Sequence, residues 1–219
     1  MSVAIYTCIT GKYDSLKNHV GIHGVDWICY TDDPDLQLPG WEIVDLEPSD
    51  APPRLKAKYP KLLAPQGDLD GYDYTIWIDG STEVISPTFV DEALADLGPD
   101  GFALFSHPWR DCIYDEVKAS RTVAFKYDHQ PLEEQAEHYR SLGHPEHWGL
   151  WACGSMARAR SGRLDAAMRD WMAEIERWSI QDQISLPFVM RTRDIHPQAW
   201  PYGQYRTPWL RFHQHVDST

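Results

Sequence analysis

The sequence lacks the features of disulfide-stabilised, zinc-binding and membrane-spanning proteins. Its four cysteines lie far apart and form no C-x-x-C pair, which argues against a zinc knuckle and a disulfide framework. No run approaches the roughly 18 apolar residues that span a bilayer, and the N-terminus begins without the basic and apolar regions of a secretory signal. We therefore expect a cytoplasmic protein with no membrane span.

Positive charge is also scarce. Twenty Lys and Arg residues stand against 33 Asp and Glu residues, a formal net charge of −13. This balance argues against a broad basic surface for duplex nucleic acid. The G-x-x-x-x-G-K-[ST], G-x-G-x-x-G and G-x-S-x-G motifs are missing as well, so the usual signatures of nucleotide-binding folds and α/β-hydrolases are not present.

Aromatic residues, by contrast, are abundant. The chain of 219 residues holds ten Trp and eleven Tyr. Many of them must fill the core, but aromatic side chains also suit stacking on bases or sugar rings. The length fits one domain, and no composition shift marks a second one.

Strand-like and helix-like segments alternate along the chain. Apolar runs rich in β-branched and aromatic residues predict strands. Residues 161–178 have apolar residues at positions i, i+3, i+4 and i+7, which predicts a helix packed against the core. The expected strands are 3–9, 25–31, 41–46, 74–78, 101–106 and 149–156, and the expected helices are 87–98, 131–142, 161–178 and one opened by an S-x-x-D capping box at 179–182. This order predicts a single α/β domain, 1–219, with a mixed, mostly parallel sheet flanked by helices. Residues 196–219 are expected to form an irregular tail that folds back on the active site.

The stretch from Tyr74 to Thr82 ends a buried strand in Asp79, Gly80 and Ser81. Ligands of open α/β sheets bind at the carboxyl ends of strands, where a carboxylate and a hydroxyl can hold a divalent cation. The alternative is an acid that caps the next element. His213 and His215 in the tail are candidates for completing a metal site, and their alternative is simple solvent exposure.

Two further groups carry charge. Arg54, Lys56, Lys58 and Lys61 form a basic segment in an acidic half of the chain, and such cations suit a diphosphate leaving group. They are alternatively a loop that offsets nearby acids. Asp182 and Gln183 open a helix, where an acid is either catalytic or merely stabilised by the helix N-terminus.

A looser group follows the strand at 101–106. It contains His107, Arg110, Tyr114 and Glu116, which are candidates for an acceptor pocket. Histidine and arginine are also frequent in loops after strands, so this group carries little weight alone.

Five blocks in order resemble a known family. They are IYTCITGKYD at 5–14, WICYTDDP at 27–34, WIDGS at 77–81, SHPWRDCIYDE at 106–116 and WSIQDQIS at 178–185. The sequence resembles a GT-A type glycosyltransferase-like family, first catalogued as a domain of unknown function, that includes plant pectin and mucilage glycosyltransferases and bacterial relatives. The resemblance implies a Rossmann-like, nucleotide-diphospho-sugar transferase fold.

The resemblance also implies residue roles. Thr7, Thr10, Tyr13 and Asp14 would flank the nucleotide, and Asp32 or Asp33 would lie near the base or ribose. Asp79 would stand at the metal-binding D-x-D position, where this sequence has Asp-Gly-Ser and lacks the second carboxylate. By similarity to glycogenin-like and galactosyltransferase-like enzymes, Asp182 and Gln183 would lie by the sugar, and His213 or His215 would complete the metal site.

The function predicted from these features is transfer of a hexose from a nucleoside diphosphate sugar, UDP-linked, to a hydroxyl acceptor. Mn²⁺ or Mg²⁺ would assist, and the glycogenin-like parallel implies retention of anomeric configuration. The alternatives are a metal-dependent nucleotidyltransferase and a non-catalytic nucleotide- or sugar-binding protein. The acceptor stays open between a glycan, a small molecule, a protein and a hydroxylated DNA base, and the oligomeric state is also open.

Overall fold

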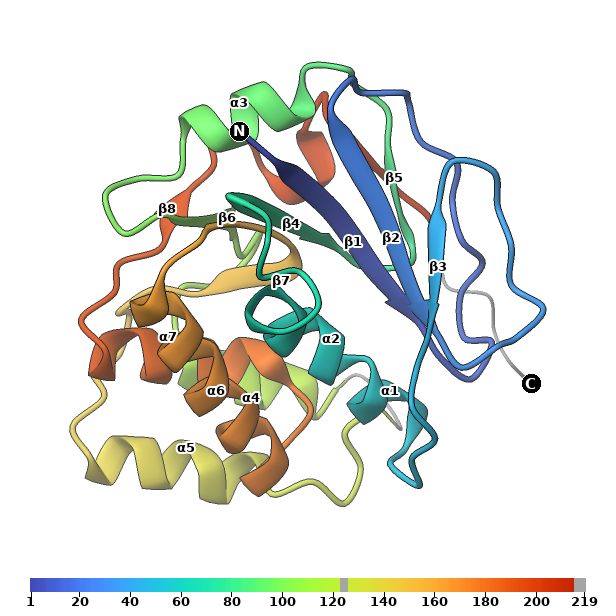
Figure 1. Ribbon diagram of the computed structural model, residues 1–219. Helices are drawn as coiled ribbons and strands as arrows, with labels where there is room; N and C mark the ends of the chain where they lie inside the picture. Colours follow the sequence, from blue (N-terminus) through green and yellow to red (C-terminus); the bar gives the residue numbers. More distant parts are fainter. Residues whose placement is uncertain (123–125, 215–219) are drawn as a thin grey trace.

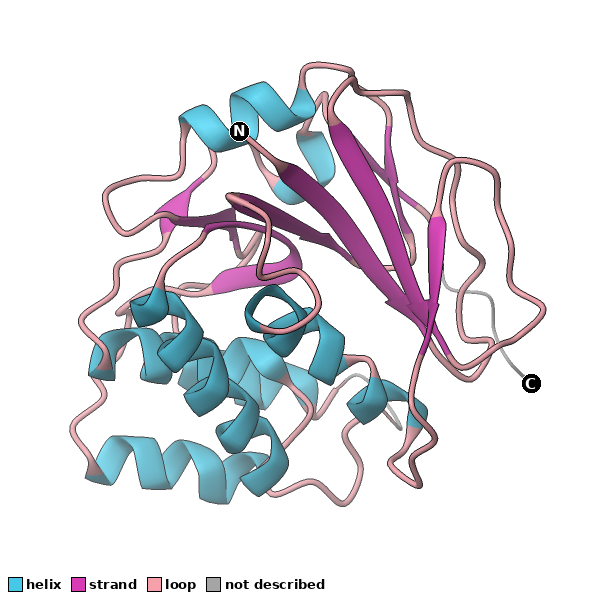
Figure 2. Cartoon of the chain, in the orientation of Figure 1, coloured by secondary structure: helices cyan, strands magenta, loops and turns pink. Residues whose placement is uncertain are grey.

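The computed structural model describes residues 1–122 and 126–214 and shows a central sheet between two layers (Figures 1 and 2). The strand order is β3-β2-β1-β4-β7-β6-β8. The strands are β1 (Val3–Ile9), β2 (Val25–Thr31), β3 (Glu42–Asp45), β4 (Tyr74–Ile78), β6 (Phe102–Ser106), β7 (Trp151–Ala159) and β8 (Gln198–Ala199). Only β7 runs antiparallel to its neighbours among these strands, so the predicted mixed, mostly parallel α/β fold is confirmed.

Helices cover both faces of the sheet. They are α1 (Pro53–Lys56), α2 (Lys58–Leu63), α3 (Phe89–Ala95), α4 (Ile113–Ser120), α5 (Leu132–Ser141), α6 (Gly162–Arg177) and α7 (Asp182–Thr192), with 3-10 turns η1 (Ala64–Gln66) and η2 (Gln204–Arg206). In Figure 1, α3 lies above the sheet, while α4 to α7 gather below it. A two-stranded ribbon of β5 (Thr82–Val84) and β9 (Leu210–Phe212) lies on the α3 side and contributes Val84 and Leu210 to that core.

Side-chain alternation along β1 explains the two layers. Ala4 and Tyr6 face the core formed with α2 and α4 to α7, whereas Val3 and Ile5 face the core formed with α3. Both sets are fully or almost fully buried, as expected for a strand in the middle of a sheet with two covered faces. All four cysteines are buried and free, in agreement with the absence of a predicted disulfide framework.

The structure corrects several sequence predictions. Ser179 does not cap the next helix: α7 begins at Asp182 after Gln181, and the Ser179 hydroxyl donates to Gln135 Oε1 at 2.6 Å. The predicted helix 87–98 is helical only over α3. The strand predicted at 149–156 instead spans Trp151–Ala159, because its last five residues pair with β4. The segment predicted to be irregular contains β8, η2 and β9 as far as residue 214.

A buried arginine fixes α2 on the sheet. The last carbonyls of a helix have no hydrogen-bond donor within the helix. Here Arg158 of β7 donates hydrogen bonds to two of them. Its guanidinium donates to the carbonyls of Lys61 (2.8 Å) and Leu62 (3.2 Å) and to the Tyr6 hydroxyl, which itself donates to the Lys61 carbonyl. Arg158 is only 3% exposed, so these bonds are shielded from water and set the position of α2.

We therefore expect Arg158→Met to lower the free energy of unfolding by about 3 kcal/mol, because it removes the buried donor to the Leu62 carbonyl and the Tyr6 hydroxyl and one of two donors to the Lys61 carbonyl. Urea unfolding measures this change. Arg160→Met, two residues along and exposed, is the matched control and should leave stability within about 0.5 kcal/mol of wild type. Equal stability of the two variants would contradict a positioning role for Arg158.

Candidate functional site

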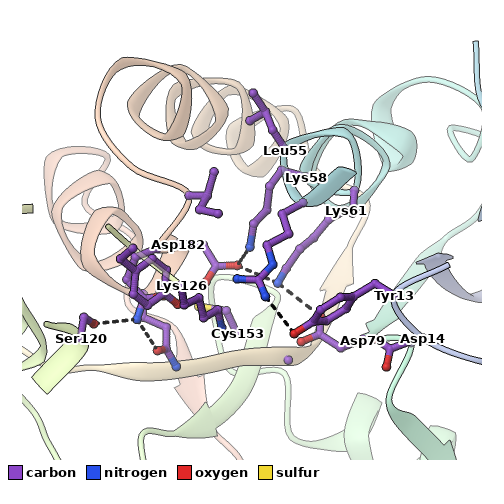
Figure 3. A pocket seen from close by; sticks show the side chains of 18 of the residues that line it. Tyr13, Asp14, Leu55, Lys58, Lys61, Asp79, Ser120, Lys126, Cys153 and Asp182 are labelled. Atoms are coloured by element: carbon purple, nitrogen blue, oxygen red, sulfur yellow. Dashed lines mark hydrogen bonds and ion pairs between the residues drawn. The ribbon is translucent and has the colours of Figure 1, made fainter. Parts of the chain in front are cut away.

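A cavity of about 1060 Å³ opens where β1 and β4 end, which is the carboxyl edge predicted for the site. The chain after each strand contributes to it, with Thr10 after β1, Asp79 after β4 and His107 after β6. Helices α2, α4 and α7 supply further lining side chains, several of which Figure 3 shows pointing into the cavity. The volume is at the upper end of the range typical of small-molecule sites.

Asp79 lies at the floor of this cavity. Its backbone N–H donates to the Gly154 carbonyl of β7 at 2.8 Å, and its Oδ1 accepts from the Trp77 indole at 2.7 Å. A Cβ added to Gly154 would lie only 3.1 Å from Asp79 Oδ2, so the glycine leaves room for this carboxylate. The Asp79 side chain is 43% exposed, and it faces the open cavity.

Two lysines of α2 converge on the buried Asp182 (Figure 3). Its Oδ2 accepts from Lys58 Nζ at 2.5 Å and from Lys61 Nζ at 2.8 Å, and Lys61 Nζ also lies 3.5 Å from Asp79 Oδ1. Lys61 thus bridges two acids that are far apart in the sequence. The bridge joins α2 and α7 to the end of β4.

This arrangement shifts the pKa values of both partners. Burial acts to raise the pKa of Asp182, but the ammonium groups of Lys58 and Lys61 outweigh it and hold the pKa well below its ordinary value. Burial acts to lower the pKa of Lys61, but Asp182 and Asp79 outweigh it and raise that pKa. Both groups are therefore charged at neutral pH.

The cavity is cationic although the chain is acidic. Of its described lining residues, five carry positive charge and four carry negative charge, a difference of +1 in a chain of −13. The cations are Arg54, Lys58, Lys61, Arg110 and Lys126, and the acids are Asp14, Asp79, Glu116 and Asp182. Arg54 donates to the Tyr13 hydroxyl at 2.9 Å and lies over its ring. An anionic ligand would therefore meet local positive charge.

A second polar network lines another part of the cavity. Glu116 of α4 accepts from Arg110 Nε at 2.6 Å and from Gln181 Nε2 at 2.9 Å. His107 Nδ1 accepts the Arg110 backbone N–H at 3.1 Å, so the neutral ring carries its proton on Nε2, 3.5 Å from Glu116. Burial lowers the pKa of His107, and the adjacent Arg110 adds to this, while Glu116 opposes it.

Most of the predicted site residues gather at this one cavity. Those that line it are Thr10, Tyr13, Asp14, Arg54, Lys58, Lys61, Asp79, Gly80, His107, Arg110, Glu116, Asp182 and Gln183. Asp32 instead accepts the Gly11 backbone N–H at 2.8 Å and pairs with Lys56, which orders the loop after β1.

Four more predicted residues lie away from the cavity lining. Thr7 is buried within β1. Tyr114 donates to the His144 carbonyl at 2.6 Å, within the helical layer. Ser81 and His213 directly flank β5 and β9, where the His213 N–H donates to the Ser81 carbonyl at 2.8 Å.

The structure describes three of the four predicted metal ligands, Asp79, Ser81 and His213, so the metal site stays a prediction. No group of three or more His, Cys, Asp or Glu side chains among residues 1–122 and 126–214 is arranged to hold a metal ion. The His213 ring contacts Glu83 at 2.8 Å, and Asp79 has the ammonium group of Lys61 beside it. His215, the other predicted histidine ligand, lies outside the described residues.

Several lining residues were missed by the sequence analysis. They are Trp109, Lys126, Tyr127, Gly154, Gln181, Gln204 and Tyr205. Gly154 had a usable signal, since an isolated glycine within an apolar strand often marks a close approach of another group. Gln204 and Tyr205 lie in the C-terminal segment, and no periodic pattern there indicates which side chains face the site.

Comparisons with known proteins agree with the fold. The family model described as TOD1/MUCI70, glycosyltransferase-like domain, matches residues 31–200. A solved structure described as the apo structure of the WbbM bifunctional glycosyltransferase aligns with a TM-score of 0.50 and 13% identity. The alignment covers 88% of this chain but 38% of WbbM. No curated protein sequence matches, and no helix in the described part of the chain is long and apolar enough to cross a membrane.

The charge cluster predicts a specific pH dependence for Asp182→Asn. The folded-state pKa of Asp182 lies below its unfolded value, so its stabilising contribution is complete above the unfolded pKa and is lost as pH falls through the folded pKa. We expect the variant to be less stable than wild type by about 3 kcal/mol at neutral pH, with the gap narrowing below about pH 4.

Urea unfolding at several pH values measures this gap. The control is Asp115→Asn, which removes an exposed acid paired with Lys118 and should leave stability unchanged. A gap between wild type and Asp182→Asn that is constant down to pH 2 would show that the lysines do not stabilise the ionised form of Asp182.

Proposed function

The chain belongs to the TOD1/MUCI70 glycosyltransferase-like domain family, and we propose that it transfers a hexose from a UDP-linked sugar to a hydroxyl acceptor. The family and the fold support glycosyl transfer in general. The donor, the acceptor class and the course of the reaction are the parts that we propose from the cavity.

The observation that carries the proposal is the cluster of Lys58 and Lys61 beside Asp79 at the carboxyl edge of the sheet. A nucleoside diphosphate sugar brings at least two negative charges on its diphosphate. Lysine ammonium groups in a partly enclosed cavity stabilise such charge more strongly than they would in water. Arg54 and Lys126 extend the same positive charge along the cavity.

The reaction breaks the bond between the anomeric carbon and the diphosphate oxygen and forms a bond from that carbon to the acceptor oxygen. The lysines would stabilise the negative charge that grows on the departing diphosphate. The Asp182 carboxylate and the Gln183 amide would face the sugar, where a nearby negative charge stabilises positive charge on the anomeric carbon. Asp79 would hold Lys61 in place and present Oδ2 to the sugar or the acceptor.

Retention of configuration is part of the proposal. Glu116 already accepts hydrogen bonds on both carboxylate oxygens, and His107 already uses both ring nitrogens within the Arg110–Glu116 network. These groups suit recognition of acceptor hydroxyls more than abstraction of a proton. We therefore assign the acceptor proton to an oxygen of the departing diphosphate, on the same face of the sugar.

A metal ion is left out of this scheme because no group of three or more His, Cys, Asp or Glu side chains in the described part of the chain is arranged to hold one. The sequence predicted Mn²⁺ or Mg²⁺ at Asp79, but Lys61 lies beside this carboxylate, and the His213 ring contacts Glu83 instead. The lysine pair supplies the positive charge that a divalent cation would bring to the diphosphate.

The cation cluster predicts how UDP affinity responds to charge removal. We expect Lys58→Met and Lys126→Met each to weaken UDP binding about tenfold or more, because each removes a charge-assisted contact to phosphate. Isothermal titration measures the affinity. Lys118→Met, at an exposed lysine of α4 that pairs with Asp115, is the control and should bind UDP like wild type.

Three results would contradict the proposed donor site or reaction. Wild-type protein that binds no nucleotide would contradict the donor assignment. Release of pyrophosphate from a nucleoside triphosphate would favour a nucleotidyltransferase. Unchanged UDP affinity in both cavity variants, with the control also unchanged, would show that the diphosphate binds elsewhere.

Metal removal gives an independent prediction. We expect the affinity for UDP after treatment with EDTA to stay within about threefold of the affinity in Mn²⁺, because lysines rather than a metal ion neutralise the diphosphate. The same titration, run on one protein batch in the two buffers, provides the comparison. Binding abolished by EDTA and restored by Mn²⁺ would contradict the lysine scheme and support the metal site predicted from the sequence.

A further inference from the structure

Two exposed aromatic rings lie together at the cavity. Trp109, in the loop after β6, is 69% exposed, and Tyr205 of η2 is 58% exposed. Both line the cavity, and their rings stack with centroids 5.8 Å apart and an interplanar angle of 30°. We infer that this Trp109–Tyr205 pair binds a pyranose ring of a saccharide acceptor, an inference that rests on the proposed glycosyl transfer.

The exposure of these two rings indicates a ligand-binding surface. A single exposed apolar residue is ordinary, but here two large aromatic side chains from distant segments meet at the same opening. The described tryptophans other than Trp109 are buried or partly buried, which makes its 69% exposure unusual within this chain. Water in contact with both rings would be released when a sugar covers them.

The rings are held in place before any ligand binds. His107 packs edge-on against Trp109, with centroids 5.8 Å apart and an interplanar angle of 77°. Tyr205 packs edge-on against Phe212 of β9, at 5.5 Å and 74°. Side chains that are already oriented lose less freedom on binding, so the pair forms a prepared surface.

Polar groups next to the rings complete a sugar site. Gln204 adjoins Tyr205, and its amide nitrogen lies 3.5 Å from the point where a Gly154 Cβ would stand, close to Asp79 Oδ2. A pyranose presents an apolar C–H face and a rim of hydroxyl groups. The aromatic pair matches the face, while the Gln204 amide and the Asp79 carboxylate match the hydroxyls.

The same features favour a saccharide over the other acceptor classes. A nucleic acid would bring phosphates to a chain of net charge −13, whose described cavity cations are already assigned to the donor diphosphate. A flat aromatic acceptor would use the rings but not the carboxylate and amide beside them. A saccharide uses both, and it can extend from the rings toward Asp79, where the transferred sugar would be received.

Saturation-transfer NMR with defined neutral tetrasaccharides tests the inference. The probes are maltotetraose, cellotetraose, mannotetraose and chitotetraose, each added to wild-type protein that contains UDP. We expect at least one to bind, with Trp109→Ala and Tyr205→Ala each weakening it about tenfold, and Trp109→Phe staying within about threefold because a ring is kept. Tyr202→Ala, three residues away and packed on Trp209, is the control and should bind like wild type.

Titration of UDP separates this inference from the proposed function. UDP affinity should be unchanged in Trp109→Ala and Tyr205→Ala, which also shows that these variants are folded. If UDP binds but no tetrasaccharide binds, or if the alanine variants bind tetrasaccharide like wild type, the inference is overturned while the donor assignment stands. Binding of 4-nitrophenol at Trp109 without any saccharide binding would likewise overturn it. Failure of wild type to bind UDP would instead overturn the proposed function.

Discussion

The contact of Lys58 and Lys61 with the Asp182 carboxylate is the interaction on which the site depends. It joins the second helix to the last long helix across the ends of the central strands. Lys61 also lies 3.5 Å from the Asp79 carboxylate, so the two lysines and two acids balance one another in charge. The described cavity lining as a whole carries five cations against four acids. A bound diphosphate would therefore meet a cavity with one more cation than acids, and it would compete with Asp182 and Asp79 for the lysine ammonium groups.

The protein surrounds this cluster with structural support. Arg158 and Tyr6 bind the carbonyls at the end of α2 and so fix the helix that carries both lysines. Next to Asp182, Gln181 links Glu116 of α4 to the start of α7. The position of each charged group is therefore set by buried hydrogen bonds from the core, which is the condition for electrostatic stabilisation without reorganisation.

The sequence predicted the parts of this molecule that depend on local patterns. The strand β1 was found because it is a continuous apolar run, the helix α6 because its apolar positions repeat with the helical period, and Asp79 because it ends an apolar run. Helix α2 is too short to show a period, so its lysines were recognised as a basic segment but not as partners of Asp182. The stacking of Trp109 on Tyr205 depends on the path of the C-terminal segment back to the sheet, and no local sequence pattern predicts this path.

A crystal structure of the protein with bound UDP tests the central claim most directly. The account predicts that the diphosphate lies in the cavity at the carboxyl ends of β1 and β4, with phosphate oxygens within about 3.2 Å of the ammonium group of Lys58, Lys61 or Lys126. A diphosphate bound outside this cavity, or held in it by a divalent metal ion with no lysine contact, would contradict the account.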